Sequence, residues 1–168
     1  MSNSPHGKIV ILFRHADKQL SSGANPGLSN AGKSQAQNLN LLCVDKKIPA
    51  PQKIWVSPKV RTRESMEVVS RHFGVECEEF RDLAERQSRE TSLQFYARIQ
   101  KVLSQAAAEK GPIFICTHYD WLEEGLAFIP TPDDQPTMSN FSWHPLSYLA
   151  FEIIEGRWHL FTKGQILP

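Results

Sequence analysis

The sequence predicts an α/β protein of three layers, with a mostly parallel central sheet, helices on both faces of that sheet and an antiparallel hairpin at the carboxyl end. Three observations carry this prediction. Short apolar runs alternate with helical patterns as far as residue 128, which is the element order that builds parallel sheets. Several of these runs are apolar throughout, as in strands that are buried on both faces. Two β-rich runs joined by Glu155-Gly156 then indicate a hairpin.

The chain has 168 residues, which is the usual size of one folded domain. It contains no internal repeat, no low-complexity tract and no change of composition that would mark a linker. We therefore expect residues 1–168 to form one domain, with residues 1–7 flexible.

Six strands and four helices are expected from the periodicity of the apolar side chains. The strands are residues 8–13, 53–57, 75–79, 113–117, 146–154 and 157–163. The helices are residues 30–42, 59–73, 91–110 and 119–128. Ser29 is the expected N-cap of the first helix. Ser57 stands at the cap position of the second helix, before Pro58, and Gly74 ends that helix.

Composition excludes several classes of partner. Apolar residues make up 40% of the chain, charged residues 22%, and the formal net charge is +1, so bulk charge favours neither nucleic acid nor an anionic membrane. No apolar run approaches the length of a membrane span, and residues 1–7 lack the pattern of a signal peptide. Three cysteines without C-x-x-C spacing predict reduced thiols, so we expect a cytoplasmic protein.

Polar residues stand where three of the predicted strands end. Arg14-His15 follows the first strand, Ser57 ends the second and precedes Arg61, and His118 follows the strand at 113–117. Ligands of such sheets bind beyond the carboxyl ends of the strands, so we expect these side chains to converge. Two histidines with two arginines suit phosphoryl transfer, because an imidazole can attack phosphorus while guanidinium groups hold the phosphoryl oxygens.

Five segments in order resemble the histidine phosphatase superfamily, whose members include the phosphoglycerate mutases. They are Arg14-His15-Ala16, Leu28-Ser29-x-x-Gly32-x-x-Gln35-Ala36, Ser57-Pro58-x-x-Arg61-Thr62-x-x-Ser65, Leu83-x-Glu85 and Cys116-Thr117-His118. Each segment alone is weak, but the five together extend the resemblance over most of the chain. The resemblance implies a phosphoglycerate-mutase-like fold.

The resemblance also implies the roles of the site residues. His15 would be the nucleophile that takes the phosphoryl group, and Arg14, Arg61 and His118 would form the phosphate pocket. Positive charge in that pocket disfavours the imidazolium form of His15 and neutralises the oxygens of the transferring group. Neither a metal ion nor another cofactor is expected, and no cluster of carboxylates stands ready to hold a metal.

The proton donor to the leaving group has two candidates. Glu85 matches the acid of the family, although Arg86-Gln87-Ser88-Arg89 replaces the glycine-containing segment that commonly follows it. Asp120 is the alternative, because the acid-phosphatase branch carries an aspartate directly after its second histidine. Here Tyr119 intervenes, which turns Asp120 away by about 100° if the helix has begun.

The substrate class also stays open between two clues. The size of the chain and its Arg14-His15-Ala16 segment resemble the small phosphohistidine phosphatases that act on signalling proteins, which typically lack a proton donor. A working Glu85 indicates a phosphate monoester instead. We therefore expect a phosphatase acting on a phosphorylated small molecule or a phosphoprotein. The alternatives are a non-catalytic phosphate- or phosphoprotein-binding module on the same fold and, less favoured, a phosphomutase.

The remaining candidates are assigned to structural places. By position, residues 18–26 and 130–136 could both rim the pocket, although the sequence does not reveal their roles. Trp121 is expected in the core or at the rim, and with Tyr119 it could line the mouth of the pocket. Arg63 faces away from Arg61 and should be solvated or paired at the surface. No motif surrounds the other four histidines, for which we expect structural roles; they are His6, His72, His144 and His159.

Overall fold

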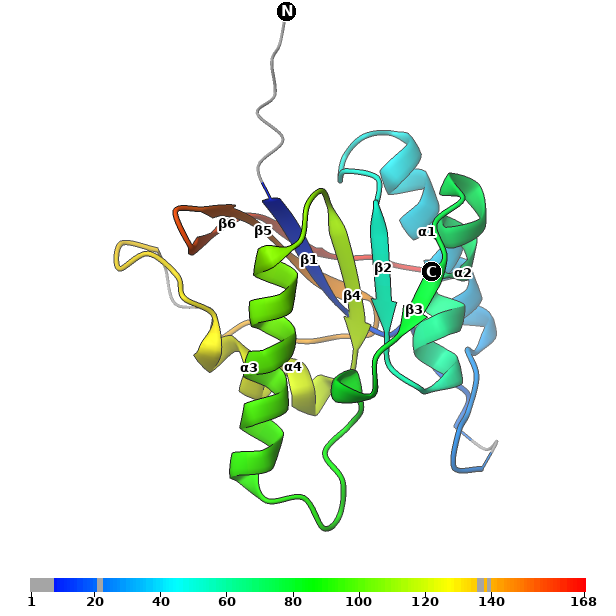
Figure 1. The fold of residues 1–168 in the computed structure, drawn as a ribbon. Coiled ribbons are helices and arrows are strands. Elements are labelled where there is room, and N and C mark those ends of the chain that lie inside the picture. The colour runs from blue at the N-terminus through cyan, green and yellow to red at the C-terminus, as the bar shows by residue number, and fades with distance from the viewer. Residues whose placement is uncertain (1–7, 21–22, 136–137, 139) are drawn as a thin grey trace, which may run out of the picture.

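The computed structural model describes residues 8–20, 23–135, 138 and 140–168, so His6 and the flexibility expected of residues 1–7 lie outside the described residues (Figure 1). The elements follow in the order β1 (Lys8–Arg14), α1 (Asn30–Val44), β2 (Lys53–Val56), α2 (Val60–Phe73), β3 (Cys77–Glu79), η1 (Arg81–Leu83), α3 (Ser92–Ala108), β4 (Ile113–Thr117), α4 (Tyr119–Gly125), η2 (Leu126–Phe128), β5 (Ser147–Ile154) and β6 (Arg157–Gln165). Every strand and helix expected from the sequence is present, with ends that differ by a few residues at most. The short 3₁₀ turn η1 was not predicted.

The sheet has six strands in the order β3-β2-β4-β1-β5-β6. The pairs β2–β3, β2–β4 and β1–β4 are parallel, whereas β1–β5 and β5–β6 are antiparallel. The hairpin turns at Glu155-Gly156, where both residues have positive φ, as the favoured two-residue hairpin turns require. The predicted mixed sheet is thus confirmed.

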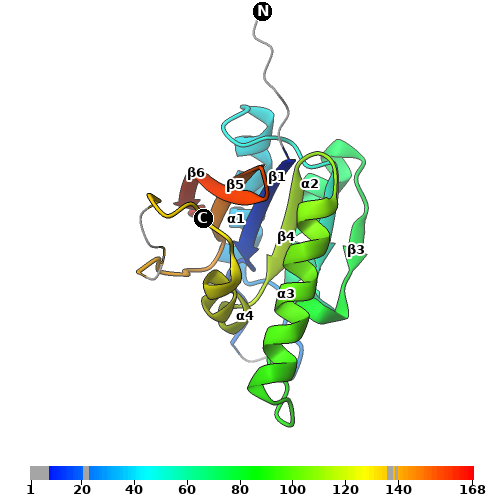
Figure 2. The ribbon, with the colours of Figure 1, turned by 60° about the vertical axis from the view of Figure 1, so that its left-hand side comes forward.

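Helices cover both faces of this sheet. Figures 1 and 2 show α3 and α4 on one face and α1 with α2 on the other. Each face carries its own apolar core: Trp55, Ile99 and Trp121 belong to the core under α3 and α4. Leu39 and Met66 belong to the core under α1 and α2. The three-layer architecture is therefore confirmed.

The helix ends explain where the helices stop and start. Ser29 caps α1 as predicted, since its side chain accepts a hydrogen bond from the Gly32 amide. Gly74 ends α2 in the left-handed conformation, also as predicted. The cap predicted at Ser57 is wrong: α2 begins at Val60 after Lys59, without a side-chain cap. The Ser57 hydroxyl contacts His118 and accepts from the amide of Lys59, which precedes the helix.

No helix in the described part of the chain is long and apolar enough to cross a membrane.

Candidate functional site

The sheet register brings the polar residues to one edge. Arg14 pairs with Thr117 across β1 and β4, and Val56 pairs with Cys116 across β2 and β4. The residues that follow these strands, His15, Ser57 and His118, therefore leave the sheet together at its carboxyl edge, where α4 begins (Figure 1). His15 and His118 face each other edge to face, with ring centroids 5.4 Å apart. The predicted convergence is confirmed for the two histidines.

His15 is held as a neutral base with a free lone pair. Its side chain is 5% exposed, and its Nδ1–H donates to the Ala16 carbonyl at 2.7 Å. A carbonyl can only accept, so Nε2 keeps its lone pair. Burial, and then the positive charges of Arg61 and Arg14, lower the pKa of His15 to about 4. This imidazole is therefore unprotonated at neutral pH, as a nucleophile must be.

His118 is fixed from both ring nitrogens. Its Nδ1 accepts from Nη2 of Arg61 at 3.2 Å, so its Nε2–H donates to the Ser57 hydroxyl at 2.7 Å. Burial, followed by the charge of Arg61, lowers the pKa of His118 to about 2. The second imidazole is thus also neutral, and Arg61, which can only donate, determines that its proton stands on Nε2.

Two guanidinium groups flank the histidines. The Arg61 side chain is 3% exposed, and its Nη2 bonds His118 and the carboxylate of Glu85. Arg14 donates to the Trp143 carbonyl and lies over the Tyr119 ring, 5.5 Å from its centroid. Within the described residues, the Nε atoms of both arginines are buried without a hydrogen-bond partner. Buried donors of this kind are what an anion can satisfy.

The Leu28–Ala36 motif fixes the backbone that follows His15. The Asp17 amide donates to the Gln35 side chain at 2.8 Å, and the Asp17 carboxylate accepts from the Ser29 hydroxyl. Gly32 packs so closely that a Cβ atom there would lie 2.0 Å from the Asp17 carbonyl oxygen. This helix therefore acts on the site through backbone placement and not through contact with a substrate.

The second motif forms a hydroxyl network below the pocket. The Ser65 hydroxyl accepts from the Ala16 amide at 2.8 Å and donates to the Arg61 carbonyl at 2.6 Å. The Thr62 hydroxyl lies 3.2 Å from that of Ser57. The hydroxyl of Ser65 thus connects the residue after His15 to the residue that carries the buried guanidinium.

Glu85 stands at the site, whereas Asp120 is engaged elsewhere. The Glu85 carboxylate pairs with Arg61, lies 3.5 Å from Nδ1 of His118 and 4.0 Å from Nζ of Lys59. Both carboxylate oxygens of Asp120 accept from backbone amides, those of Arg86 at 2.7 Å and Trp121 at 2.9 Å. The structure therefore favours Glu85 of the two predicted acids, and Asp120 ties the residue after Glu85 to α4.

The segment around Glu85 has a partner that sequence reasoning missed. Arg98, in α3, donates to three backbone carbonyls of residues 82–85 and pairs with Glu90. No motif contains Arg98, and a lone arginine in a helix pattern carries no signal of its own. Only the tertiary placement of α3 beside this segment brings the contacts about.

The structure decides two open questions about the pocket rim, whose residues 21, 22 and 136 lie outside the described part of the chain. Trp121 is fully buried, and its indole N–H donates to the Asp82 carbonyl at 2.9 Å, so it belongs to the core and not to the mouth. Residues 130–135 bond β6 through Trp158 and Leu160, beside the end of the sheet where β1 begins. Arg63, as predicted, is half-exposed and paired with Glu79.

The mouth is built from other segments. Tyr119 is 50% exposed beside Arg14, and with residues 140–144 and Glu123 it lines a hollow of about 440 Å³. Lys18, in the segment predicted to rim the pocket, is close enough for its charge to lower the pKa of His15 and of His118. This hollow lies beside Arg14, which donates to the Trp143 carbonyl and lies over the Tyr119 ring.

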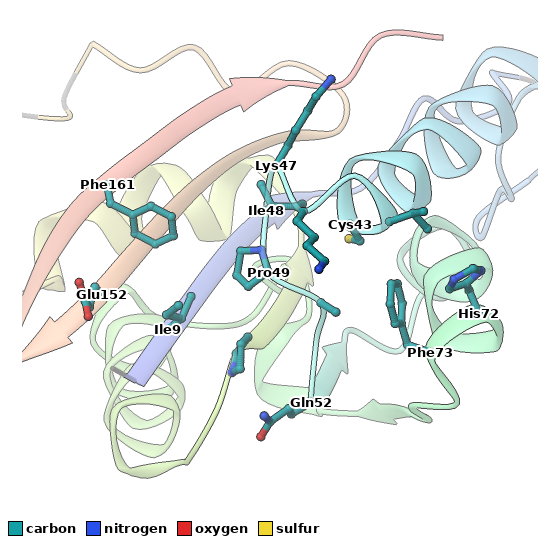
Figure 3. A pocket seen from close by; sticks show the side chains of 14 residues that line it. Ile9, Cys43, Lys47, Ile48, Pro49, Gln52, His72, Phe73, Glu152 and Phe161 are labelled. Carbon is teal, nitrogen blue, oxygen red and sulfur yellow. The ribbon is translucent and has the colours of Figure 1, made fainter. Parts of the chain in front are cut away.

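A larger hollow of about 940 Å³ lies at the opposite end of the sheet, where Ile9, Ile48 and Phe161 line it (Figure 3). It contains none of the predicted site residues, although His72 stands at its rim. Over the residues the structure describes, no group of three or more His, Cys, Asp or Glu side chains is gathered for a metal ion.

Several solved structures share this fold. SixA of Agrobacterium tumefaciens, designated a phosphohistidine phosphatase, has a TM-score of 0.70 at 19% identity and covers 94% of this chain and 97% of its own. A phosphoserine phosphatase of Entamoeba histolytica has a TM-score of 0.72 at 14% identity, covering 92% and 95%. The α-ribazole phosphatase of Shigella flexneri has a TM-score of 0.73 at 17% identity, covering 95% and 97%. At these identities the likeness establishes the fold.

The sequence also matches a known protein family. The model of the histidine phosphatase superfamily, branch 1, matches residues 10–90, which include His15, Arg61 and Glu85. None of the curated proteins matches the chain. The match places residues 10–90, just under half of the chain, in the histidine phosphatase superfamily, branch 1, and the fold of the described residues is phosphoglycerate-mutase-like.

Proposed function

We propose that the protein hydrolyses a phosphate monoester or a protein phosphohistidine through a phosphohistidine intermediate on His15, without a metal ion or other cofactor. The observation that carries the proposal is the state of His15: a buried, neutral imidazole whose Nδ1–H is bound to Ala16, which leaves the Nε2 lone pair for attack. Arg61 and Arg14 beside it would supply the charge that a phosphoryl group requires.

In the first step, Nε2 of His15 attacks phosphorus, a P–N bond forms, and the bond between phosphorus and the leaving atom breaks. The substrate phosphate would displace the Glu85 carboxylate from Arg61, because both groups are anions that bind the same guanidinium. Glu85, in its protonated form, would then give its proton to the leaving oxygen.

In the second step, water attacks the phosphohistidine while the Glu85 carboxylate takes a proton from that water. The P–O bond to water forms, and the P–N bond breaks, which returns His15 to its starting state. His118 would assist as a donor once Arg61 turns from its Nδ1 to the substrate: the proton would move from Nε2 to Nδ1, where it faces a phosphoryl oxygen, and the Ser57 hydroxyl would donate to Nε2.

The first test is p-nitrophenyl phosphate hydrolysis in the presence of EDTA, with wild type, His15→Ala and His72→Ala compared. We expect His15→Ala to lower kcat by roughly a thousandfold or more, the loss typical of a missing nucleophile. The control is His72→Ala, which should leave kcat unchanged because His72 is exposed on α2. Circular dichroism of each variant checks that the fold is retained.

The intermediate has its own measurement. Wild type quenched in alkali during turnover should carry a phosphoryl group that is stable to base and labile to acid, and His15→Ala should carry none. Turnover that persists in His15→Ala, or that EDTA removes from the wild type, would contradict the proposal. A wild type without turnover that still binds vanadate would support the binding-module alternative.

A further inference from the structure

We infer that Arg98 positions the proton donor, and that the substrate is the phosphate monoester of an aliphatic alcohol and not a protein phosphohistidine. This inference rests on the proposed function, because it assigns Glu85 the role of proton donor there. We refer to residues 82–86 as the donor loop. The loop has no regular structure beyond the turn of η1, so its shape depends on what holds its backbone.

Arg98 holds three backbone carbonyls of the donor loop with one guanidinium group. Its Nη1 donates to the carbonyls of Asp82 at 2.7 Å and Ala84 at 2.6 Å, and its Nη2 donates to the carbonyl of Glu85 at 3.0 Å. A planar guanidinium offers five N–H donors in a fixed arrangement, which suits several acceptors at once. Glu85 thus leaves the backbone from a point fixed by a charged donor.

Glu90 in turn fixes Arg98. The Glu90 carboxylate accepts from Nε of Arg98 at 2.6 Å and from Nη2 at 2.9 Å, and both side chains are nearly buried, 13% and 10% exposed. The hydrogen bonds from Arg98 hold the pKa of Glu90 below its usual value, so the partner stays charged. The guanidinium also lies over the Phe95 ring, 4.5 Å from its centroid.

The rest of the donor loop is tied to the elements that carry the second histidine. The Thr117 hydroxyl, one residue before His118, donates to the Leu83 carbonyl at 2.6 Å. The Asp120 carboxylate, two residues after His118, accepts from the Arg86 amide at 2.7 Å. Arg98 on one side and these two residues on the other fix the position of Glu85 relative to His118.

The chemistry of the leaving group connects this arrangement to the substrate. The imidazole that leaves a phosphohistidine is a good leaving group, whereas an aliphatic alkoxide needs a proton as its P–O bond breaks. A carboxyl group held beside the pocket by a buried ion pair serves that proton transfer, in which the Glu85 proton goes to the alcohol oxygen. Small deviations in the placement of such a group reduce its rate contribution strongly.

The experiment compares glycerol 2-phosphate, p-nitrophenyl phosphate and a phosphohistidine-containing peptide as substrates. The variants are Glu85→Gln, Arg98→Gln, Arg98→Lys and the double variant Glu85→Gln/Arg98→Gln. Lys101→Gln is the matched control, since Lys101 also lies on α3 and pairs with the exposed carboxylate of Asp82 without touching the loop carbonyls.

We expect Arg98→Gln to lower kcat on glycerol 2-phosphate by about tenfold or more, within the contribution typical of a general acid. Its kcat on p-nitrophenyl phosphate should stay within about twofold, because that phenolate leaves without a proton. Arg98→Lys should fall between wild type and Arg98→Gln, since an ammonium cannot reach all three carbonyls. The double variant should lose no more than Glu85→Gln, because both changes remove one function.

Equal losses on both esters would overturn the positioning role, and Lys101→Gln behaving like Arg98→Gln would do the same. A phosphohistidine peptide hydrolysed faster than glycerol 2-phosphate by the wild type would overturn the substrate assignment. If Arg98→Gln does not fold, the same comparison of kcat on glycerol 2-phosphate and on p-nitrophenyl phosphate is made with Arg98→Lys. Loss of all p-nitrophenyl phosphate turnover in His15→Ala, beside any of these results, would show that the proposed function stands while the inference fails.

Discussion

At the scale of single residues, one neighbour sets the proton on each imidazole. The Ala16 carbonyl holds the proton of His15 on Nδ1, and the Ser57 hydroxyl accepts the proton of His118 from Nε2. These partners differ in kind: a carbonyl can only accept, whereas a hydroxyl can reverse. The nucleophile is therefore fixed in one tautomer by Ala16, whereas His118 keeps its proton on Nε2 as long as Arg61 donates to Nδ1.

Ser57→Ala tests this difference. Removing the hydroxyl takes away the partner of His118 Nε2, a hydrogen bond that contributes roughly 1 kcal/mol. We expect kcat/KM for p-nitrophenyl phosphate to fall by about threefold to tenfold, with the fold unchanged. Ser104→Ala, an exposed serine on α3, is the control and should keep wild-type kcat/KM. Wild-type kcat/KM in Ser57→Ala would show that His118 does not need this partner.

At the scale of elements, α1 sets the backbone that carries His15. Gln35 receives the Asp17 amide and donates in turn to the carbonyls of Pro145 and Ile166. Because Gly32 has no side chain, the helix approaches the Asp17 carbonyl more closely than a residue with a Cβ atom would allow. The residues of this motif thus determine the position of the nucleophile although none of them contacts it.

Gly32→Ala is predicted to disturb this contact. Alanine favours the helix by up to about 1 kcal/mol, but a Cβ atom 2.0 Å from backbone forces α1 and the Asp17 segment apart. We expect the free energy of unfolding in urea to fall by about 1–3 kcal/mol, the usual cost of overpacking. Ser34→Ala, exposed on the same helix, should change it little. Equal stability of both variants would mean that the contact relaxes without cost.

At the scale of the whole molecule, burying two neutral histidines makes the fold sensitive to acid. The pKa of His15 is about 4 and that of His118 about 2, both below the ordinary value of 6.5. Below pH 6.5 the unfolded chain binds protons that the folded chain does not, so stability rises with pH in this range. The contribution of each neutral histidine to the free energy of unfolding is therefore complete above about pH 6.5. As the pH falls, the contribution of His15 is lost down to about pH 4, and that of His118 continues to be lost below pH 4.

Urea unfolding at pH 7 and pH 5 measures this loss. We expect the wild type to lose about 4 kcal/mol more between these two pH values, about 2 kcal/mol for each histidine, than His15→Gln/His118→Gln, in which neither group titrates. His72→Gln, whose imidazole is exposed, should lose as much as the wild type. The same pH dependence in the double variant and the wild type would assign the loss to other groups.

The sequence was sufficient for the elements, because each is signalled locally. Apolar runs such as residues 113–117 mark buried strands, and Gly74 and Glu155-Gly156 mark chain reversals through backbone conformations that few residues adopt. The cap of α2 could not be predicted, since α2 begins only at Val60 and the Ser57 hydroxyl meets His118, which lies 61 positions away in the sequence.

The site divides in the same way. Arg14, His15, Arg61, Glu85 and His118 stand out in the sequence because motifs surround them, and the structure brings together the histidines, Arg61 and Glu85. The place of Trp121, core or pocket mouth, stayed open in the sequence because proximity to His118 along the chain does not say which way α4 turns its side chains. Asp120 and Glu85 were indistinguishable until their oxygens had partners.

The sequence by itself therefore determined the fold class, the order of the elements and the residues at the carboxyl edge of the sheet. Local propensities and motifs carry that information. Only the tertiary structure decided the proton positions on both histidines, the engagement of Asp120 and the support of Glu85 by Arg98. The physical reason is that hydrogen bonds and desolvation depend on which residues far apart in the sequence come into contact, and a local sequence pattern does not specify those contacts.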